Sequence, residues 1–457
     1  MIESTLARAS ERMAGRLHGG DAAFRGVSTD TRTLVESELF FALEGPSFDG
    51  GEFLPQAAAA GAAGAVVGKP VESALPVIEV ADTRRALGTL AGSWRRRMPA
   101  SVVGVTGSNG KTTLKEMIAS CLALAGPTLA TRGNLNNDVG VPLMLARLDL
   151  THRHAVFEMG ANHPGEIAWL TSLVVPDIAV ITNAGPAHLE GFGTIEGVAK
   201  AKGEILQGEP RPAWAVLNAD DRHCGLWRRL AGDIGVRTFG LAEDADVRAV
   251  DVAATAAGTT FTLVADDFEL PLAIALAGRH NAELAAAAAA VASIAGLDPA
   301  RIRRGLETAG PVSGRLNALA GIEGCTLYDD SYNANPASVI AAAEFLSAGT
   351  GEPWLVLGDM GELGDDSEML HRQVGETLAA KGIARLFATG PLSRNTVEGF
   401  GEGGAWFESA EALIDAASRQ LSAMQAHRIR VLVKGSRAMH METVVQALAA
   451  RAPRRED

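Results

Sequence analysis

A glycine-rich run between an apolar stretch and a helical stretch constrains this chain most. The run is Gly104-Val105-Thr106-Gly107-Ser108-Asn109-Gly110-Lys111-Thr112-Thr113, which follows SVVGV and precedes LKEMIASCLALAG. Glycines let backbone N–H groups wrap an anion, and the following helix adds its positive N-terminal end. Lys111 can reach the β and γ phosphates of a nucleotide, and the Thr112 hydroxyl suits Mg²⁺. We therefore predict a phosphate-binding loop that joins a buried strand to a helix.

The loop is a variant of the usual motif. The strict pattern GxxxxGK[ST] would place glycine at position 105, where this chain has Val105 preceded by Gly104. The alternative is a glycine-rich turn with an exposed lysine. The strand, the helix and GKTT in register favour the phosphate loop.

The length of the chain predicts three domains, because 457 residues correspond to roughly three domains of about 150 residues each. Short apolar strands alternating with Ala-rich helices predict a small α/β domain over residues 1–98. The buried strands VVGV, HAVFEM, DIAVITN and WAVLN, separated by helical sequence, predict a doubly wound parallel sheet over 99–312, with a β-meander at 247–277. The α/β pattern returns over 313–457 in CTLYDD, WLVLGDM, RLFATG and RVLVKGS.

Charge and composition exclude several classes of function. Lys and Arg number 41 against 54 Asp and Glu, so the net charge of −13 argues against a general nucleic-acid or anionic-membrane binder. The arginines at 95–97 are interpreted as a solvated helix end. The apolar run Leu284–Leu297 is too short to span a bilayer, and the N-terminus has no signal-peptide pattern. The three cysteines form no CxxC pair, and they are Cys121, Cys224 and Cys325. We therefore expect the cysteines to be reduced and the protein to be cytoplasmic.

Further polar side chains follow buried strands. Glu158 ends HAVFEM, and His188 comes after DIAVITN; open α/β sheets bind ligands at the carboxyl ends of such strands. A carboxylate and a neutral imidazole there can hold Mg²⁺ beside a cradled phosphate. His188 could instead be a loop histidine bonded to a carbonyl. Lys200 and Lys202 follow in VAKAKGEI, where a solvated helix face is the alternative and spacing favours neither lysine.

Taken together, the motifs resemble a known family. In order and spacing, TGSNGKTT, GNLNNDVGVP, FEMGANHPGEI, TNAGPAHLEGFG and AKAKGEI resemble the central ATPase domain of the Mur ligases, ATP-dependent enzymes that extend the peptide of the peptidoglycan precursor. LNADD, GRHNAEL, SGRLN and DDSYNANP continue the resemblance. The segments VLGDMGELGDDSEMLHRQVGE and VLVKGSRAMHME are most similar to the member that adds D-Ala-D-Ala. STDTRTLVESELFFALEGPSFDGGEFLPQA is similar to the family's uridine-nucleotide-binding domain, and the DNPR-type motif of the member that adds the third residue is missing from the sequence.

The resemblance implies an α/β fold of three domains. These are a small N-terminal α/β uridine-nucleotide domain, a central doubly wound P-loop ATPase domain and a C-terminal Rossmann-like α/β domain that binds the incoming dipeptide. It implies ATP and Mg²⁺ as cofactors, UDP-MurNAc-tripeptide and D-Ala-D-Ala as substrates, an acyl-phosphate intermediate and a monomer without nucleic-acid partner or membrane insertion.

The resemblance also implies roles for individual residues. The catalytic residues would be Lys111, Glu158, His188, Lys202 and Arg315, and the metal ligands Thr112, Glu158, His188 and Lys202. The ATP-binding residues would be Thr106, Gly107, Ser108, Asn109, Gly110, Lys111, Thr112, Thr113, Asn281, Arg315 and Asp330. The substrate-binding residues would be Ser28, Thr29, Asp30, Arg32, Asn134, Asn136, Asn137, Asn333 and Asn335. Lys202 matches the lysine that the family carbamylates, which makes sense because an ammonium would repel Mg²⁺. Leu284 stands where the family has the asparagine that meets adenine.

Two alternatives remain at this point. One is another amide ligase of the same type, such as a further Mur ligase or a folylpolyglutamate synthase, although the uridine-type first domain argues against the latter. The other is a nucleotide-binding protein that has kept the fold without ligation. Phosphate release with and without D-Ala-D-Ala would discriminate them.

Overall fold

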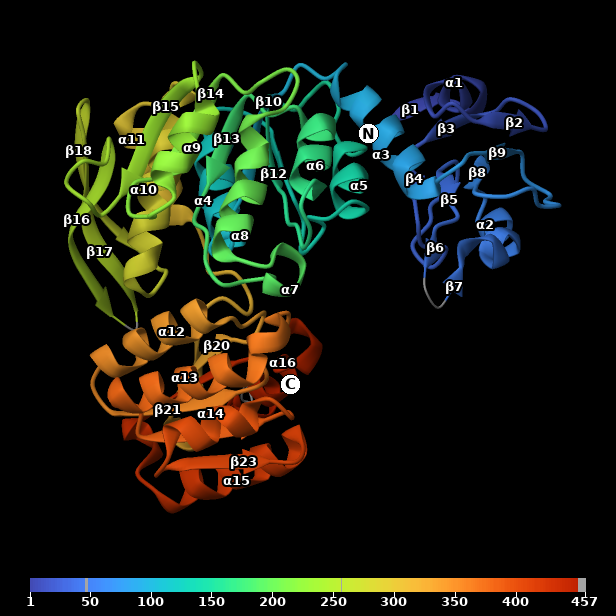
Figure 1. Ribbon diagram of the computed structural model, residues 1–457. Helices are drawn as coiled ribbons and strands as arrows, with labels where there is room; N and C mark the ends of the chain where they lie inside the picture. Colours follow the sequence, from blue (N-terminus) through green and yellow to red (C-terminus); the bar gives the residue numbers. More distant parts are fainter. Residues whose placement is uncertain (46–47, 256, 451–457) are drawn as a thin grey trace, which may run out of the picture.

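In the computed structural model, which describes residues 1–45, 48–255 and 257–450, one large sheet organises each third of the chain (Figure 1). The N-terminal sheet has the strand order β2-β9-β8-β5-β4, with β2 antiparallel to β9 and the other neighbours parallel. The strands are β2 (Arg16–His18), β4 (Val27–Ser28), β5 (Leu39–Phe41), β8 (Gly64–Val67) and β9 (Val77–Glu79). Small ladders pair β1 (Glu3–Thr5) with β3 (Ala23–Arg25) and β6 (Glu44–Gly45) with β7 (Phe48–Asp49).

The two faces of this sheet are covered by different helices. Phe40 packs with α2 (Leu54–Ala59), whereas its neighbours Leu39 and Phe41 pack with α1 (Leu6–Arg12). Successive side chains of a strand point to opposite faces, so ELFFALEG supplies both cores.

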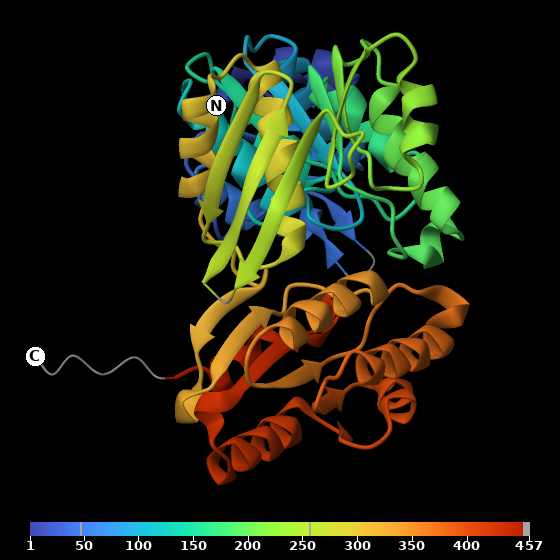
Figure 2. The ribbon, with the colours of Figure 1, turned by 90° about the vertical axis from the view of Figure 1, so that its left-hand side faces the viewer.

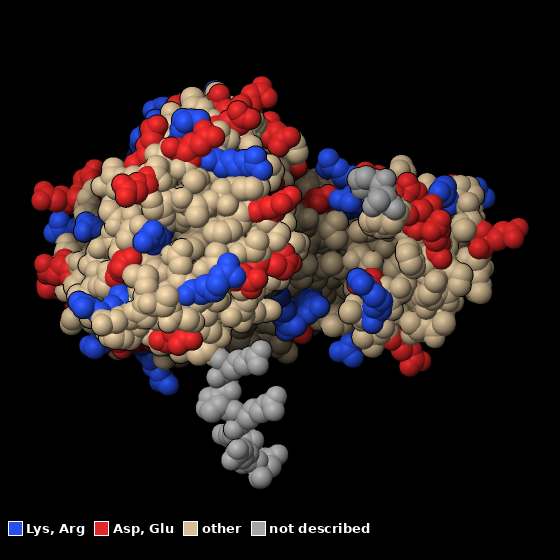
Figure 3. Space-filling view, turned by 90° about the horizontal axis from the view of Figure 1, so that it is seen from below, with Lys and Arg blue, Asp and Glu red and all other residues tan. Residues whose placement is uncertain are grey.

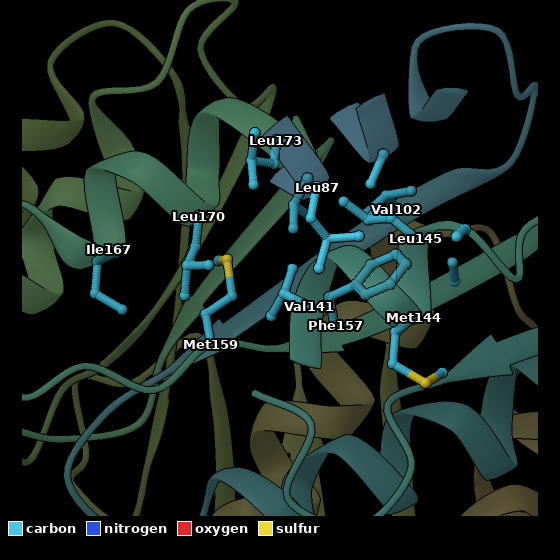
Figure 4. Close-up of a cluster of buried hydrophobic side chains, with 14 of the residues drawn as sticks. Leu87, Val102, Val141, Met144, Leu145, Phe157, Met159, Ile167, Leu170 and Leu173 are labelled. Carbon is cyan, nitrogen blue, oxygen red and sulfur yellow. The ribbon is translucent and has the colours of Figure 1, made fainter. Parts of the chain in front are cut away.

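Helix α3 (Thr83–Arg95) precedes the predicted boundary at residue 98 but packs against the middle domain. Trp94 Nε1 donates to the Leu148 carbonyl at 2.9 Å, and Leu87 points into the same apolar cluster as side chains of the middle domain (Figure 4). The expected solvated helix end is wrong for Arg95, which is only 7% exposed. Its guanidinium donates to the carbonyls of Val174, Val175 and Met98. These carbonyls satisfy the buried cation's donors and tie α3 to the middle domain.

The middle domain is built on a nine-stranded sheet, and the predicted parallel winding is confirmed. The order is β11-β12-β10-β13-β14-β15-β16-β17-β18, parallel through β16 and antiparallel over the last three strands, which form the predicted meander. The strands are β10 (Ser101–Thr106), β11 (Thr128–Ala130), β12 (His154–Glu158), β13 (Ile178–Ile181), β14 (Trp214–Asn218), β15 (Gly235–Gly240), β16 (Val247–Thr255), β17 (Gly258–Ala265) and β18 (Phe268–Ile274). The antiparallel strands extend along the side of the domain toward the C-terminal domain (Figure 2).

Helices cover both faces of the middle sheet, which explains why its strands are continuous apolar runs. On one face, beside α3, lie α5 (Gly140–Leu145), α6 (Glu166–Val174), α8 (Ile195–Gly203) and α9 (Cys224–Ala231). On the other lie α4 (Lys111–Ala123), α10 (Arg279–Ile294) and α11 (Pro299–Thr308). The short α7 (Leu189–Phe192) lies on the side of the C-terminal domain (Figure 1). Buried alanines of α10 let it approach both α4 and the sheet closely.

The C-terminal sheet has the order β19-β20-β24-β21-β22-β23, parallel except for β19. Its strands are β19 (Asn317–Ala320), β20 (Thr326–Asp330), β21 (Glu352–Leu357), β22 (Arg385–Thr389), β23 (Gly404–Phe407) and β24 (Ile429–Lys434). One face packs on α12 (Pro336–Ala348), α13 (Ser367–Ala380) and α14 (Ser393–Phe400), the other on α15 (Ala410–Ala423) and α16 (Glu442–Leu448). The three-domain α/β fold is therefore as predicted.

The helices and one face of the surface bear on membrane crossing and on charge. Within the described ranges, none of the helices combines the length and the apolar character that a bilayer crossing requires. Seen from the C-terminal domain, acidic and basic side chains are interspersed (Figure 3).

Candidate active site

A cavity of about 490 Å³ lies between the middle and C-terminal domains. Its walls follow the carboxyl ends of β10, β12 and β13 on one side and of β20, β21 and β24 on the other. This is where ligands bind in open α/β sheets. The polar and charged lining residues are Ser108, Asn109, Lys111, Asn134, Asn136, Asn137, Asp138, Glu158, Asn162, Glu166, His188, Arg315, Tyr332, Asn333, Asn335, Ser338, Glu362, Lys434, Ser436 and Arg437.

The glycine-rich run forms a tight loop between β10 and α4. Gly110 caps α4 with a φ of +80°, in the left-handed region that favours glycine. A Cβ atom at this position would lie 2.9 Å from Leu284 Cδ2. Leu284 therefore packs against the loop. This contact explains why an apolar residue stands at position 284, where the family has asparagine.

A neighbouring segment holds the loop in place. The Asn109 N–H donates to Asn183 Oδ1 at 2.9 Å, and Thr182 Oγ1 donates to the Asn109 carbonyl at 2.6 Å. Ser108 Oγ accepts from the Gly185 N–H at 3.0 Å. The loop's shape is thus fixed by the end of β13, before any ligand contact.

Lys111 lies under the loop rather than in solvent. Its Nζ donates to the carbonyls of Gly107 at 2.6 Å and Ser108 at 3.0 Å. Burial lowers the pKa of Lys111 to about 8; Glu158 opposes this shift and Arg315 adds to it. An anion at the loop would replace both carbonyls as the partner of this cation and favour its charged form.

Glu158 presents a carboxylate oxygen without a partner. The side chain is 2% exposed, and Oε1 accepts from Asn136 Nδ2 at 2.8 Å. Its Oε2 is buried and has no hydrogen-bond partner among the residues that the structure describes. A buried unpartnered carboxylate oxygen is costly unless a cation or donor completes it. The oxygen thus fits a divalent cation beside the phosphate loop.

His188 connects the middle domain to the C-terminal domain. It is the N-cap of α7, with a φ of +56°, and its Nδ1 contacts the Glu362 carboxylate. The imidazole beside it lowers the pKa of Glu362. The structure gives His188 a carboxylate partner in place of the carbonyl of the alternative interpretation, and its role as a metal ligand stays a prediction.

The two lysines of α8 differ completely. Lys200 is exposed, whereas Lys202 is buried and its Nζ donates only weakly, at 3.5 Å, to the Ala161 carbonyl. The ammonium lies 5.3 Å from the Phe192 ring centroid. Burial lowers the pKa of Lys202 to about 7, and Lys111 contributes in the same direction. A substantial fraction of Lys202 is therefore an uncharged, nucleophilic amine at neutral pH.

Arg315 reaches from the C-terminal domain to the phosphate loop. Its Nη2 donates to Thr112 Oγ1 at 3.3 Å, and its guanidinium lies 4.1 Å from the Tyr332 ring centroid. Asp330 instead pairs with Lys434 Nζ at 2.7 Å, and Lys434 lines the cavity while Asp330 does not. The Lys434–Asp330 pair thus leaves one partner facing the cavity.

Several predicted residues lie outside the cavity. Thr106 is buried and donates to the Met159 carbonyl at 2.9 Å, and Asn281 Nδ2 donates to the Ala277 carbonyl at 2.7 Å. Thr113 is buried in the first turn of α4. The N-terminal set Ser28, Thr29, Asp30 and Arg32 belongs to a separate part of the molecule. There Arg32 pairs with Asp30 at 2.6 Å.

The predicted asparagines line the cavity: Asn134, Asn136, Asn137, Asn333 and Asn335. Asn335 is also the N-cap of α12, and its Nδ2 donates to Asn109 Oδ1 at 2.9 Å across the domain boundary. Residues that the sequence analysis did not assign also line it: Asp138, Glu166, Trp169, Tyr332, Glu362, Lys434, Ser436 and Arg437. Many of these residues follow a predicted strand within one of the motifs quoted above. Their position after a strand was the sequence signal that could have identified them.

Comparison with known proteins agrees along the whole chain. The family described as Mur ligase middle domain matches residues 105–292, and the one described as Mur ligase, glutamate ligase domain matches residues 314–437. The chain is 44% identical over 451 residues to the UDP-N-acetylmuramoyl-tripeptide--D-alanyl-D-alanine ligase of Escherichia coli K12, covering 98% of this chain and 99% of that protein.

Solved structures give the same result. A crystal structure of MurF from Acinetobacter baumannii superposes with a TM-score of 0.91 at 34% identity, covering 97% of this chain and 98% of that one. The structure of MurF ligase from Thermotoga maritima in complex with ADP gives a TM-score of 0.82 at 27% identity, covering 93% and 96%. The similarity therefore includes all three domains.

Proposed function

The chain belongs to the Mur ligase family, and we propose that it uses ATP to join D-Ala-D-Ala to the tripeptide of UDP-MurNAc-tripeptide in peptidoglycan precursor synthesis. The observation that carries this proposal is the 44% identity to a ligase of that name over nearly the full length of both proteins. The cavity is consistent with it, since a phosphate loop and a second α/β domain meet there.

The reaction needs two steps, because a carboxylate is a poor acyl donor. First, a terminal carboxylate oxygen of the tripeptide attacks the γ-phosphorus of ATP, the bond to the β-phosphate oxygen breaks, and ADP leaves. Then the amine of D-Ala-D-Ala attacks the acyl carbon, inorganic phosphate leaves, and the amine loses a proton as the amide forms. Phosphoryl transfer of this kind depends on positioning and on charge neutralisation.

Lys111 and Arg315 supply that neutralisation from opposite sides of the cavity. Lys111 lies beneath the loop amides, and Arg315 extends from the C-terminal domain to Thr112. Together they would hold the β and γ phosphates in line with the incoming carboxylate. The placement of Arg315 makes this half of the phosphate site depend on the C-terminal domain.

Thr112 and Glu158 would hold Mg²⁺, which offsets the negative charge that gathers during phosphoryl transfer. The support is the unpartnered Glu158 Oε2 and the position of Thr112 in the first turn of α4. Asn136 keeps Glu158 oriented by donating to its other oxygen. His188 would turn from Glu362 to complete a second cation site.

We further propose that Lys202 is carbamylated. Its burial and lowered pKa favour the uncharged amine, whose nitrogen adds to the carbon of CO₂ and then loses a proton. The product is an anion in place of a buried cation, which reverses the electrostatic effect of this side chain on a metal site. The exposed Lys200 has no comparable environment.

The N-terminal domain would bind the uridine nucleotide through Ser28, Thr29, Asp30 and Arg32. Arg32 is 86% exposed on its side chain, and its only ion-pair partner among the described residues is Asp30, so the guanidinium is accessible to a diphosphate. We place the reaction in the cytoplasm, where ATP is available. We also propose a monomer, as the family resemblance implies.

Phosphate release tests the proposal. With ATP, Mg²⁺ and UDP-MurNAc-tripeptide, release should rise strongly on adding D-Ala-D-Ala and should be lost in Lys111→Ala. Release that ignores the dipeptide would indicate an ATPase or a nucleotide-binding relative. Turnover with glutamate and a folate in place of these substrates would indicate a folylpolyglutamate-type ligase.

A further inference from the structure

We infer that Glu362 binds the ammonium group of the acceptor dipeptide, an inference that rests on the proposed function. Among the described residues that line the cavity, Glu362 is the one carboxylate contributed by the C-terminal domain. The other charged groups from this domain are cationic: Arg315, Lys434 and Arg437. A dipeptide with a free amino group carries a positive charge before it reacts, and these cations would repel it.

The three cations differ in how they are occupied. Arg315 contacts Thr112 and Tyr332, and Lys434, which is buried, pairs with Asp330. Within the described part of the chain, Arg437 pairs only with Glu442, at 3.1 Å, and its side chain is 54% exposed. Arg437 is therefore the cation that a second anion can most readily reach.

Glu362 and Arg437 come from neighbouring loops. They follow β21 and β24, which are adjacent parallel strands. A Cβ atom at Gly361 would lie 3.4 Å from Ser436 Cβ, so the two loops touch one residue before each charge. A carboxylate and a guanidinium carried on touching loops can complement a zwitterion, which a D-alanyl-D-alanine molecule is at neutral pH.

The position of Glu362 also suits the chemistry. Its carboxylate contacts His188 Nδ1 and its carbonyl accepts from the Glu190 N–H, so it lies against the middle domain. Lys111 and Glu158, which line the same cavity, belong to that domain. An ammonium held by Glu362 would thus stand on the side of the cavity where the acyl phosphate forms. After it gives up one proton, the resulting amine would be a positioned nucleophile. About half of the Glu362 side chain is exposed and can receive a ligand.

Calorimetric titration tests this pairing with two acceptors. The enzyme is held with ADP, Mg²⁺ and UDP-MurNAc-tripeptide and titrated with D-Ala-D-Ala or with N-propionyl-D-alanine, which has the same skeleton without the amino group. We expect the wild type to prefer D-Ala-D-Ala by about 10- to 100-fold, the range of a charge-assisted hydrogen bond. Glu362→Gln should remove most of this preference and leave N-propionyl-D-alanine binding nearly unchanged. Glu362→Asp should retain part of it.

The controls separate recognition from a structural role. Glu368→Gln makes the same charge change on an exposed residue of α13 and should keep the full preference. If Glu362 only joined the domains through His188, Glu362→Gln would weaken both acceptors equally. That result, or a wild type without preference, would overturn the inference. Failure of the proposed function would appear separately, as wild-type phosphate release that does not respond to D-Ala-D-Ala.

Discussion

At the scale of single residues, Lys202 is buried, although a lysine side chain is ordinarily charged and exposed to solvent. We expect Lys202→Ala to lose ligation almost completely and to recover part of it with a short-chain carboxylic acid, which can occupy the vacated anion position. Lys200→Ala is the matched control, because it removes a lysine two residues away that is exposed, and its effect should be mild. Initial rates of dipeptide-dependent phosphate release measure both. Reversed phenotypes would assign the modification to Lys200.

The same residue predicts a pH dependence of stability. The pKa of Lys202 is lowered from 10.5 to about 7 in the folded protein, so the folded state binds this proton less readily than the unfolded chain. Burying the lysine therefore lowers stability progressively as pH falls from about 10 to 7, and by a constant amount below 7. In CO₂-free buffer, Lys202→Met should be more stable than wild type by on the order of 2–5 kcal/mol at pH 7, and less so at pH 9.5. Urea unfolding measures the difference; a gain that is independent of pH would contradict this prediction.

Arg32 tests the N-terminal substrate site. We expect Arg32→Ala to raise the KM for UDP-MurNAc-tripeptide about tenfold, by loss of one charge-assisted contact, and to leave the KM for ATP unchanged. Because the Arg32 side chain is exposed, a folding defect would not explain a raised KM in this variant. Steady-state kinetics with each substrate varied in turn separates the two values. An unaltered KM for the uridine substrate would move that site elsewhere.

At the scale of elements, the start of α4 depends on the contact between Gly110 and α10. Gly110→Ala would place a Cβ in the left-handed region and against Leu284. We expect it to cost about 1–3 kcal/mol of stability and to raise the KM for ATP, because the loop amides would shift. Gly20→Ala is the control, since no heavy atom lies within 4 Å of that added Cβ. Equal effects of both variants in thermal melts and ATP kinetics would contradict the role of this contact.

The elements also show what the sequence could predict. The buried parallel strands were predictable because helices on both faces make each of them a continuous apolar run, as in Val102, Val103 and Val105. The two- and three-residue strands β1 to β4 are too short to show a period. Arg95 was misassigned because a run of arginines usually faces water, whereas here carbonyls from α6 satisfy the first of them.

The residues of the candidate site also divide into those that the sequence could predict and those that it could not. The positions of Lys111 and Glu158 at the cavity were predictable because a local motif or a strand end carries them, and that of Asn136 because GNLNNDVGVP resembles the family. Glu362 and Arg437 were not assigned, because their proximity depends on the order of β21 and β24. These strands begin 77 residues apart, at Glu352 and Ile429, and become neighbours only in the fold. Sequence spacing contains no information on which strands become neighbours.

At the scale of the whole molecule, polar side chains connect the middle and C-terminal domains across the cavity. They include Arg315 with Thr112, Asn335 with Asn109 and Glu362 with His188. Such contacts are individually weak in water, and interfaces of this kind permit domain motion. Both the proposed phosphate site and the proposed acceptor site would need this closed arrangement.

Domain closure is therefore the prediction for the whole chain. We expect the free enzyme to populate open forms through a hinge near Gly310–Ser313, in the connection between α11 and β19. A non-hydrolysable ATP analogue with Mg²⁺ and UDP-MurNAc-tripeptide should lower the radius of gyration in small-angle X-ray scattering. The bound phosphates would attract both Lys111 and Arg315 and so draw the two domains together, an attraction that the free protein lacks. Arg315→Ala should bind the analogue more weakly and compact less at saturation, whereas the exposed Lys200→Ala should compact like wild type. A radius that does not change in the wild type would mean that the contacts across the cavity already hold the domains closed, and Arg315 would then position phosphates without moving a domain.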